Sequence, residues 1–384
     1  YNEFRKEEYP HIKFSNGFFG ETNPIPLKHS HTHWIADKAI QMIEQYTNMS
    51  LYSNDKINIK NNTKSSTNNI TKNSSNNQDD NKRNNKDYHN NGINNDNKER
   101  PWMMSIDFSE PHLPCRPSEP FAGMYDSSSI PIWPSFEENF NNKPYIQQQQ
   151  LYSWGIENFA WNDWAPIVAR YYGIISQMDD AIGRIMDKLD SLGIANNTIV
   201  LYSADHGDMC GSHRMIDKHY VLYDDIVKVP LIARWPGVIG SGAVCNNFVC
   251  HSLDIPPTIL DIAGIIGKEF FQGTSLMPLL KKEKVGEWRK FAVSTYNGQQ
   301  FGLYTQRMIR TEEWKYIWNT VDIDELYNLK NDPYELNNLI HDSRYSELLI
   351  KLRHMLYDEL IKDMDDLIVG NQWLKTQLIG GKKI

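Results

Sequence analysis

Apolar residues recur at helical spacing in four stretches of the chain. The stretches cover residues 34–43, 166–189, 253–263 and 343–361. In the second stretch the apolar side chains lie three or four positions apart, so they form one face of a long helix. Gly193 follows this stretch and predicts the end of the helix, because glycine readily adopts the left-handed backbone that closes a helix. The spacing therefore predicts four helices.

Runs of apolar and β-branched residues alternate with these helices and predict strands. The runs at 102–108, 198–203 and 229–235 have the continuous apolar character of strands that are buried on both faces of a sheet. Helices that alternate with such strands are typical of an α/β fold. We expect residues 1–286 to form an α/β domain with a central, mostly parallel sheet that helices flank.

The pattern changes beyond residue 286. Short strands are predicted at 291–296, 306–311 and 314–318, and the helix at 343–361 follows them. Neighbouring short strands pair most simply in an antiparallel sheet. Residues 287–384 are therefore predicted to form a small α+β subdomain with an antiparallel sheet.

One long segment has no apolar pattern. Residues 54–99 consist mainly of Asn, Lys, Ser, Asp and Thr, with hardly any aromatic or large aliphatic side chain. Such a segment cannot bury enough apolar area to offset the entropy lost on ordering. The composition predicts a disordered, Asn-rich insertion in the α/β domain, between the helix at 34–43 and the strand at 102–108.

Charge and hydropathy narrow the possible partners. The 384 residues include 40 basic and 48 acidic side chains, which gives a net charge of −8. No dense stripe of Lys or Arg is present to follow a phosphate backbone, so nucleic acid is not an expected partner. No stretch approaches the roughly 20 apolar residues that cross a bilayer, and the mean hydropathy is −0.59. We expect no membrane span.

The first group of candidate chemical residues follows the predicted strand at 198–203. Asp205, His206, Gly207 and Asp208 come directly after it. In open α/β sheets, ligands collect at the carboxyl ends of strands. A carboxylate and an imidazole together can hold a divalent cation, so Asp205 and His206 are candidate metal ligands. The alternative is that Asp205 caps the next segment and His206 is a structural loop residue.

Two further residues are candidates for binding an oxyanion. Lys218 lies twelve positions after His206, and its ammonium group is a compact charge that suits a sulfate or phosphate oxygen. His112 stands between Pro111 and Pro114, just after the predicted strand at 102–108. Alone, Lys218 is more simply a solvated surface lysine, and His112 a structural histidine.

Several motifs occur in a fixed order along the chain. They are PHLP, LYSADHGDMCGSH, VPLIARWPG, HSLDIPPTILDIAGI and RMIRTEEWKYIWN followed by DELYNLKNDPYELNNL. Taken together, these motifs resemble the sulfatase family of the alkaline phosphatase superfamily. Within that family the pattern is most similar to bacterial arylsulfatases, choline-sulfatase-like enzymes and phosphonate monoester hydrolases. The resemblance covers nearly all of the chain outside the Asn-rich insertion, and it implies an alkaline-phosphatase-like α/β sandwich.

The resemblance implies a role for each candidate residue. Asp205 and His206 match the pair that binds the active-site cation, usually Ca²⁺, with Mn²⁺ or Mg²⁺ as alternatives. Lys218 matches the lysine that binds the sulfuryl oxygens. His112 matches the histidine that contacts the substrate oxygens or the leaving group. The family nucleophile is a formylglycine hydrate, which attacks sulfur and releases the alcohol and then sulfate.

Two features of the family pattern have no match in this sequence. These are two further acidic metal ligands after the first strand and the nucleophile signature C/S-x-P-S/A-R. The nearest match, at 115–119, reads Cys-Arg-Pro-Ser-Glu and has Glu119 in place of the arginine, so we interpret it as coincidence. We expect the 384 residues to be an N-terminally incomplete portion of such an enzyme, with the formylglycine upstream of Tyr1. Without that portion, we expect weak metal binding and no turnover.

Three functions remain open at this point. The first is a sulfuric ester hydrolase that acts on a sulfate ester of a small molecule or a glycan. The second is a phosphonate or phosphate ester hydrolase on the same scaffold. The third is a non-catalytic, sulfatase-like protein that binds sulfated glycans. The residues leave the substrate and the oligomeric state undecided, and only the resemblance points to a secreted or lysosomal protein.

Aromatic residues before the helix at 166–189 have two interpretations. Trp154, Phe159, Trp161 and Trp164 either form a wall for a sugar or aryl ring, or pack this helix against the sheet.

Overall fold

The computed structural model describes residues 1–14, 17–60, 101–265, 271–298 and 304–382. The chain divides into two units, Tyr1–Trp34 with Phe108–Ile384, and Ile35–Asp107. The helices are α1 (Asn2–Glu8), α2 (His31–Lys60), α3 (Tyr145–Trp154), α4 (Trp161–Ser191), α5 (Asp224–Val227), α6 (His251–Ile262), α7 (Met277–Leu280), α8 (Ser346–Lys362) and α9 (Gln372–Gly380). The strands are β1 (Val200–Ser203), β2 (Leu231–Arg234), β3 (Phe291–Tyr296), β4 (Gln306–Thr311), β5 (Trp314–Asn319) and β6 (Glu325–Asn328).

The unit Ile35–Asp107 contains most of α2. Ala36, Ala39 and Ile43 are buried, at the helical spacing that the apolar pattern predicts. The helix continues to Lys60 and so includes the first residues of the predicted insertion, whereas residues 61–99 of that insertion lie outside the described residues. None of the helices in the described ranges is long and apolar enough to cross a membrane.

The predicted strand at 102–108 is wrong. These residues alternate between half-buried and exposed, as in a strand, but they belong to neither of the two sheets that the structure describes. An apolar run forms a strand only when a neighbouring strand satisfies its backbone hydrogen bonds. The extended segment nevertheless leads into the loop that carries His112.

The longest helix of the other unit is α4, which begins five residues before the predicted start. The Asp163 carboxylate accepts a hydrogen bond from the Ala160 backbone N–H at 2.9 Å and so fixes the first turn. At the other end Gly193 has φ +68°, as its position after the apolar face predicts. The helix buries one face in the core, including Trp164, Val168, Ile174, Met178, Ala181, Ile185 and Leu189.

Strands β1 and β2 form a two-stranded antiparallel sheet, in which Val200 pairs with Arg234 and Ser203 with Leu231. The parallel pairing expected for these runs is wrong. Parallel neighbours need a crossover, usually a long helix, whereas the connection from β1 to β2 contains only a three-residue 3-10 helix (Ser212–Arg214) and the short helix α5. The expected burial on both faces is also wrong, because all four β1 residues are half-buried.

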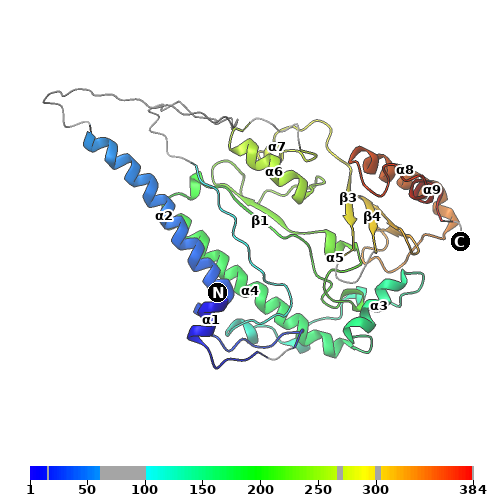
Figure 1. Cartoon of the computed structure of the whole chain (residues 1–384), viewed down its shortest axis with the longest axis horizontal. Coiled ribbons are helices and arrows are strands. Elements are labelled where there is room, and N and C mark those ends of the chain that lie inside the picture. The colour runs from blue at the N-terminus through cyan, green and yellow to red at the C-terminus, as the bar shows by residue number, and fades with distance from the viewer. Residues whose placement is uncertain (15–16, 61–100, 266–270, 299–303, 383–384) are drawn as a thin grey trace, which may run out of the picture. The chain divides into compact units, whose positions relative to one another are not determined.

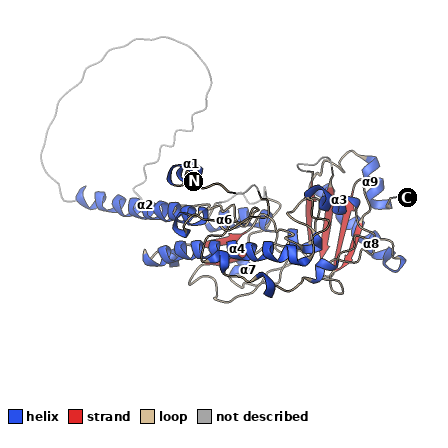
Figure 2. Cartoon of the chain, turned by 90° about the horizontal axis from the view of Figure 1, so that it is seen from below, coloured by secondary structure: helices blue, strands red, loops and turns tan. Residues whose placement is uncertain are grey.

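Strands β3 to β6 form the predicted antiparallel sheet, in sequence order. Its two faces are buried against different partners, because side chains alternate along a strand. Met308 and Ile317, which pair across β4 and β5, belong to the same core cluster as Trp164 of α4. Ile309 and Tyr316 face the opposite way, toward α8 and α9. Both views show α8 and α9 on the side of this sheet away from α4 (Figures 1 and 2).

Candidate active site

Asp205 and His206 follow β1 directly, as predicted. The Asp205 side chain is 88 % exposed, and its Oδ1 accepts a hydrogen bond from the His206 backbone N–H at 3.0 Å. His206 Nδ1 lies 2.7 Å from the Gly207 carbonyl oxygen, so Nδ1 is a donor and Nε2 is the ring nitrogen that is left for another partner. Nε2 lies 3.5 Å from Asp205 Oδ2. The two side chains therefore place an imidazole nitrogen and a carboxylate oxygen side by side.

Glycine is required at position 207. Its N–H donates to the Ile226 carbonyl oxygen at 2.9 Å, and a β-carbon added there would lie 1.8 Å from the Asp225 carbonyl oxygen. No side chain fits so close an approach of two backbone segments. The chain can therefore turn sharply at the end of β1 and lead into the loop that carries Lys218.

His112 and Lys218 meet in the structure. Lys218 Nζ lies 2.7 Å from His112 Nε2. His112 Nδ1 lies 2.8 Å from the Leu113 carbonyl oxygen, which can only accept, so Nδ1 carries the proton. Nε2 is then the acceptor for the lysine ammonium group. The two residues that were predicted separately to bind an oxyanion thus form one hydrogen-bonded pair, although their roles in chemistry stay a prediction.

Asp217 is the acidic partner of this pair. Its Oδ1 lies 3.3 Å from Lys218 Nζ, and its Oδ2 lies 3.2 Å from His219 Nε2. Burial alone would raise the pKa of Asp217, but the His219 hydrogen bond and the Lys218 charge outweigh it and lower this pKa to about 2. Asp217 is therefore ionised at neutral pH, and its carboxylate lies 3.3 Å from the Lys218 ammonium group as an ion-pair partner.

Asp208 shapes the backbone that leads to Lys218. Its Oδ1 accepts hydrogen bonds from the backbone N–H groups of Cys210 at 2.8 Å and Asp217 at 3.2 Å. Burial raises the pKa of Asp208, although these two hydrogen bonds oppose the effect. One carboxylate thus joins the two ends of the segment between Cys210 and Asp217.

The sequence offered two interpretations of the aromatic residues before α4, and the structure separates them. Trp164 is fully buried and Trp161 is 8 % exposed, so both pack in the core and cannot line an open pocket. Trp154 is half-buried and stacks on Phe18, with ring centroids 4.4 Å apart. Core packing is therefore the role of the two buried tryptophans.

Comparison with known proteins identifies the family. A family model described as "Sulfatase" matches residues 16–265. The chain belongs to the sulfatase family. A second model, described as "N-sulphoglucosamine sulphohydrolase, C-terminal", matches residues 211–362. The resemblance seen in the motifs is confirmed, and the matched region includes all four predicted site residues.

Individual sulfatases are similar over most of the chain. A Delta 4,5-hexuronate-2-O-sulfatase from Bacteroides thetaiotaomicron is 32 % identical over 71 % of this chain and 60 % of its own length. An arylsulfatase from Clostridium perfringens is 32 % identical over 72 % of this chain and 57 % of its own length. The chain thus spans less than two thirds of the length of either relative.

A solved structure confirms the α/β fold class. The crystal structure of a phosphonate monoester hydrolase from Agrobacterium radiobacter matches with a TM-score of 0.70. The match covers 94 % of this chain and 68 % of the other, at 21 % sequence identity. At this identity the match shows the shared sulfatase-type fold alone.

Sulfatases generally bind a divalent metal, and Asp205 and His206 fit part of such a site. A carboxylate oxygen and an imidazole nitrogen are both suitable ligands, and their 3.5 Å separation lets one cation contact both. Within the described ranges, no group of three or more His, Cys, Asp or Glu residues is arranged to hold a metal ion. Asp205 and His206 are therefore candidates for two ligands of such a site, and their role as ligands stays a prediction.

Cys115 does not have the properties of a sulfatase nucleophile or modification site. It is 1 % exposed, and its thiol contacts the Pro111 carbonyl oxygen at 3.4 Å. Burial, together with the nearby Asp208 charge, raises the pKa of the Cys115 thiol to about 12. The thiol therefore stays protonated in the core. This observation supports the interpretation of residues 115–119 as a chance match.

Three residues of this region, Asp217, Glu138 and His213, were not predicted as site residues. Asp217 adjoins the predicted lysine, and an acidic neighbour of a candidate cationic residue is a signal that could have identified it. Glu138 and His213 lie 75 positions apart, yet His213 Nδ1 lies 2.8 Å from Glu138 Oε2. No local pattern in the sequence predicts a contact over that separation.

Proposed function

We propose that this protein is a metal-dependent sulfuric ester hydrolase. The observation that carries the proposal is the 2.7 Å hydrogen bond between Lys218 Nζ and His112 Nε2, which joins residues 106 positions apart. The resemblance assigns these two side chains to the transferred sulfuryl group. Family membership and the similarity to curated sulfatases support the same activity.

Lys218 would bind the sulfuryl oxygens. Its ammonium group has three N–H donors. Without a ligand it contacts His112 and Asp217, and a bound sulfuryl group would replace or share these contacts. The Lys218 side chain is only 18 % exposed, so little water screens its charge. A preorganised positive charge in such a setting stabilises the negative charge that develops on the transferred group.

His112 would hold the proton for the leaving alcohol. Its Nδ1 is fixed as a donor to the Leu113 carbonyl oxygen, so Nε2 is the nitrogen that faces the reacting group. Once Lys218 turns to the sulfuryl oxygens, Nε2 no longer accepts from the lysine. Nε2 can then take up a proton from solvent, and the imidazole can donate this proton to the departing oxygen as a general acid.

Asp205 and His206 would hold the cation, for which we propose Ca²⁺, with Mn²⁺ and Mg²⁺ as alternatives. When bound, a divalent cation polarises the oxygens of the transferred group. We further propose that the formylglycine nucleophile and the remaining metal ligands come from residues outside this sequence.

A sulfate ester of a sugar is the proposed substrate class. One similar relative is named for 2-O-sulfated hexuronate, and another for aryl sulfates. The phosphonate hydrolase, in contrast, is similar in fold only. We therefore expect the site to prefer a sulfuryl over a phosphoryl group.

A substrate panel tests this proposal on the full gene product. We expect kcat/KM for an aryl sulfate to exceed that for the matched aryl phosphonate and aryl phosphate by about tenfold or more, a difference of ~1.4 kcal/mol in activation free energy. A faster phosphonate or phosphate ester would replace the proposed activity with the second function considered above. Binding of sulfated glycans without hydrolysis of any ester would contradict the proposal and favour a non-catalytic protein.

A further inference from the structure

The loop that carries Lys218 has an unusual backbone. Between β1 and α5, several residues other than glycine have positive φ, namely Cys210, His213, Arg214, Asp217 and Tyr220, with values from 36° to 67°. Such residues each cost roughly 1 kcal/mol or more in the left-handed region. A loop of this shape persists only when the surrounding contacts hold it, so the position of Lys218 depends on those contacts.

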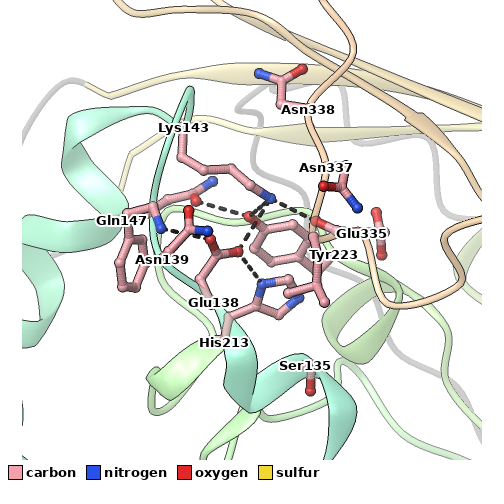
Figure 3. A network of polar contacts seen from close by, with 12 residues as sticks. Ser135, Glu138, Asn139, Lys143, Gln147, His213, Tyr223, Glu335, Asn337 and Asn338 are labelled. Atoms are coloured by element: carbon pink, nitrogen blue, oxygen red, sulfur yellow. Dashed lines mark hydrogen bonds and ion pairs between the residues drawn. The ribbon is translucent and has the colours of Figure 1, made fainter.

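One contact lies on the amino-terminal side of Lys218. His213 Nδ1 donates to Glu138 Oε2 at 2.8 Å, and both side chains are 1 % exposed. The His213 ring also stacks on Tyr223, with centroids 4.0 Å apart and an interplanar angle of 11°. Figure 3 shows His213 and Tyr223 together beside Glu138. Two residues of the loop, His213 before Lys218 and Tyr223 after it, therefore contact each other.

A buried lysine contacts Tyr223 directly and is linked to His213 through Glu138. Lys143 Nζ lies 3.3 Å from Glu138 Oε2, and it donates to Tyr223 Oη at 3.1 Å. It also donates to Tyr327 Oη of β6 at 2.9 Å and to the Glu335 carbonyl oxygen at 2.6 Å. The Lys143 side chain is fully buried, and Figure 3 shows it at the centre of the network. Lys143 therefore links Tyr223 of the loop to β6 of the four-stranded sheet.

Both oxygens of the Glu138 carboxylate accept hydrogen bonds. Oε2 serves His213 and Lys143, and Oε1 accepts from the Phe140 backbone N–H at 2.7 Å. Burial alone would raise the pKa of Glu138, but His213 and Lys143 outweigh it and hold this pKa below its usual value. Glu138 is therefore an anion in the core, and it orients the His213 ring and with it the start of the loop.

We propose that His213 and Glu138 are positioning residues for Lys218, which hold the loop so that the lysine ammonium group reaches His112. Neither residue is among those that we assign to the substrate or the metal. That Lys218 binds a sulfuryl group rests on the proposed function. The claim that His213 and Glu138 position Lys218 concerns only the Lys218–His112 hydrogen bond and can be tested without it. A network that served stability alone would leave this hydrogen bond unchanged in any variant that still folds.

The test replaces His213 by asparagine. Asparagine tolerates positive φ, but it is too short to reach Glu138 and cannot stack on Tyr223, while Glu138 keeps its ion pair with Lys143. The matched control is Arg214→Asn, at the next position in the same loop, where φ is 60°. Arg214 donates to the Glu157 carbonyl oxygen, outside this network. Both variants are compared at a temperature at which circular dichroism shows them folded.

Two readouts separate positioning from stability. The first is the ¹⁵N chemical shift of His112 Nε2, which reports the hydrogen bond from Lys218 without any assay of activity. The second is the affinity for inorganic sulfate. In His213→Asn we expect the Nε2 signal to move toward that of Lys218→Ala and sulfate to bind about tenfold more weakly, because an ångström of displacement removes much of the benefit of a placed charge. Arg214→Asn should match the wild type in both.

Further variants keep the proposal testable if His213→Asn does not fold. Glu138→Gln must place its amide NH₂ group against another donor, so it should shift the same signal in the same direction. Since His213 and Glu138 act as one unit, the double variant should shift it no further than His213→Asn alone. If the folded variants keep the wild-type His112 signal and sulfate affinity, the two residues serve stability alone and the inference is wrong. If sulfate binds equally well to Lys218→Ala, the proposed function fails instead, while the NMR readout still decides the positioning claim.

Discussion

Lys218→Ala is expected to lower kcat/KM for an aryl sulfate by about a hundredfold to a thousandfold, because it removes one preorganised charge from the transferred group. The lysine is 18 % exposed and is held between His112 and Asp217. Water that fills the space of the missing ammonium group would have to reorient during the reaction, whereas the lysine is already in place. Steady-state kinetics of the full gene product measure the effect.

The matched control for this prediction is Lys228→Ala. Lys228 is an exposed lysine ten positions further along the chain. Its replacement by alanine changes the net charge by the same amount as Lys218→Ala but leaves the Lys218–His112 hydrogen bond in place. We expect its kcat/KM to stay close to that of the wild type. Equal kcat/KM values for Lys218→Ala and the wild type would contradict the assignment of Lys218 to the active site.

Lys315→Met is expected to lower the free energy of unfolding by about 3–5 kcal/mol, which is typical when one partner of a buried ion pair is removed. Lys315 of β5 is fully buried, and its Nζ lies 2.7 Å from Asp224 Oδ1 and 2.6 Å from Glu335 Oε1. It also donates to the Leu222 carbonyl oxygen at 3.0 Å. Methionine fills a similar volume but leaves Glu335 buried without this cation. Chemical denaturation at neutral pH measures the loss.

Lys330→Met provides the comparison for Lys315. The Lys330 side chain is 69 % exposed and pairs with Glu313 at 3.0 Å. Exposed ion pairs contribute roughly 0–1 kcal/mol, so this variant should stay within that range. A loss for Lys315→Met no larger than that for Lys330→Met would show that the buried lysine does not hold the sheet to the end of the Lys218 loop.

Local patterns predicted local structure well. Strands β3 and β4 have the predicted ends, and β5 differs by one residue, because each run has clear boundaries in the sequence. The direction in which β1 and β2 pair was not predictable in the same way. An apolar run shows that a strand is buried, but not which strand lies beside it or in which direction. Strand β6 and helix α9 were not predicted, since their apolar patterns are short.

The candidate site could be named in part from the sequence because its residues lie in recognisable motifs, although their roles stay a prediction. Asp205 and His206 follow a strand, and the His112 and Lys218 motifs match a family pattern, so all four could be named from the sequence. The hydrogen bond between His112 and Lys218 depends on the fold and could not be predicted. Glu138 lies in an aperiodic segment, and nothing in the sequence distinguishes it from its exposed neighbour Glu137.

The central claim is that Asp205 belongs to a metal site on which hydrolysis of the sulfate ester depends. Its most direct test measures aryl sulfate hydrolysis by the full gene product as calcium is added back after chelation, in the wild type and in Asp205→Ala. The account predicts saturable recovery of activity in the wild type and none in Asp205→Ala at the same calcium concentrations. Activity that survives chelation, or an Asp205→Ala variant that recovers as the wild type does, would contradict it.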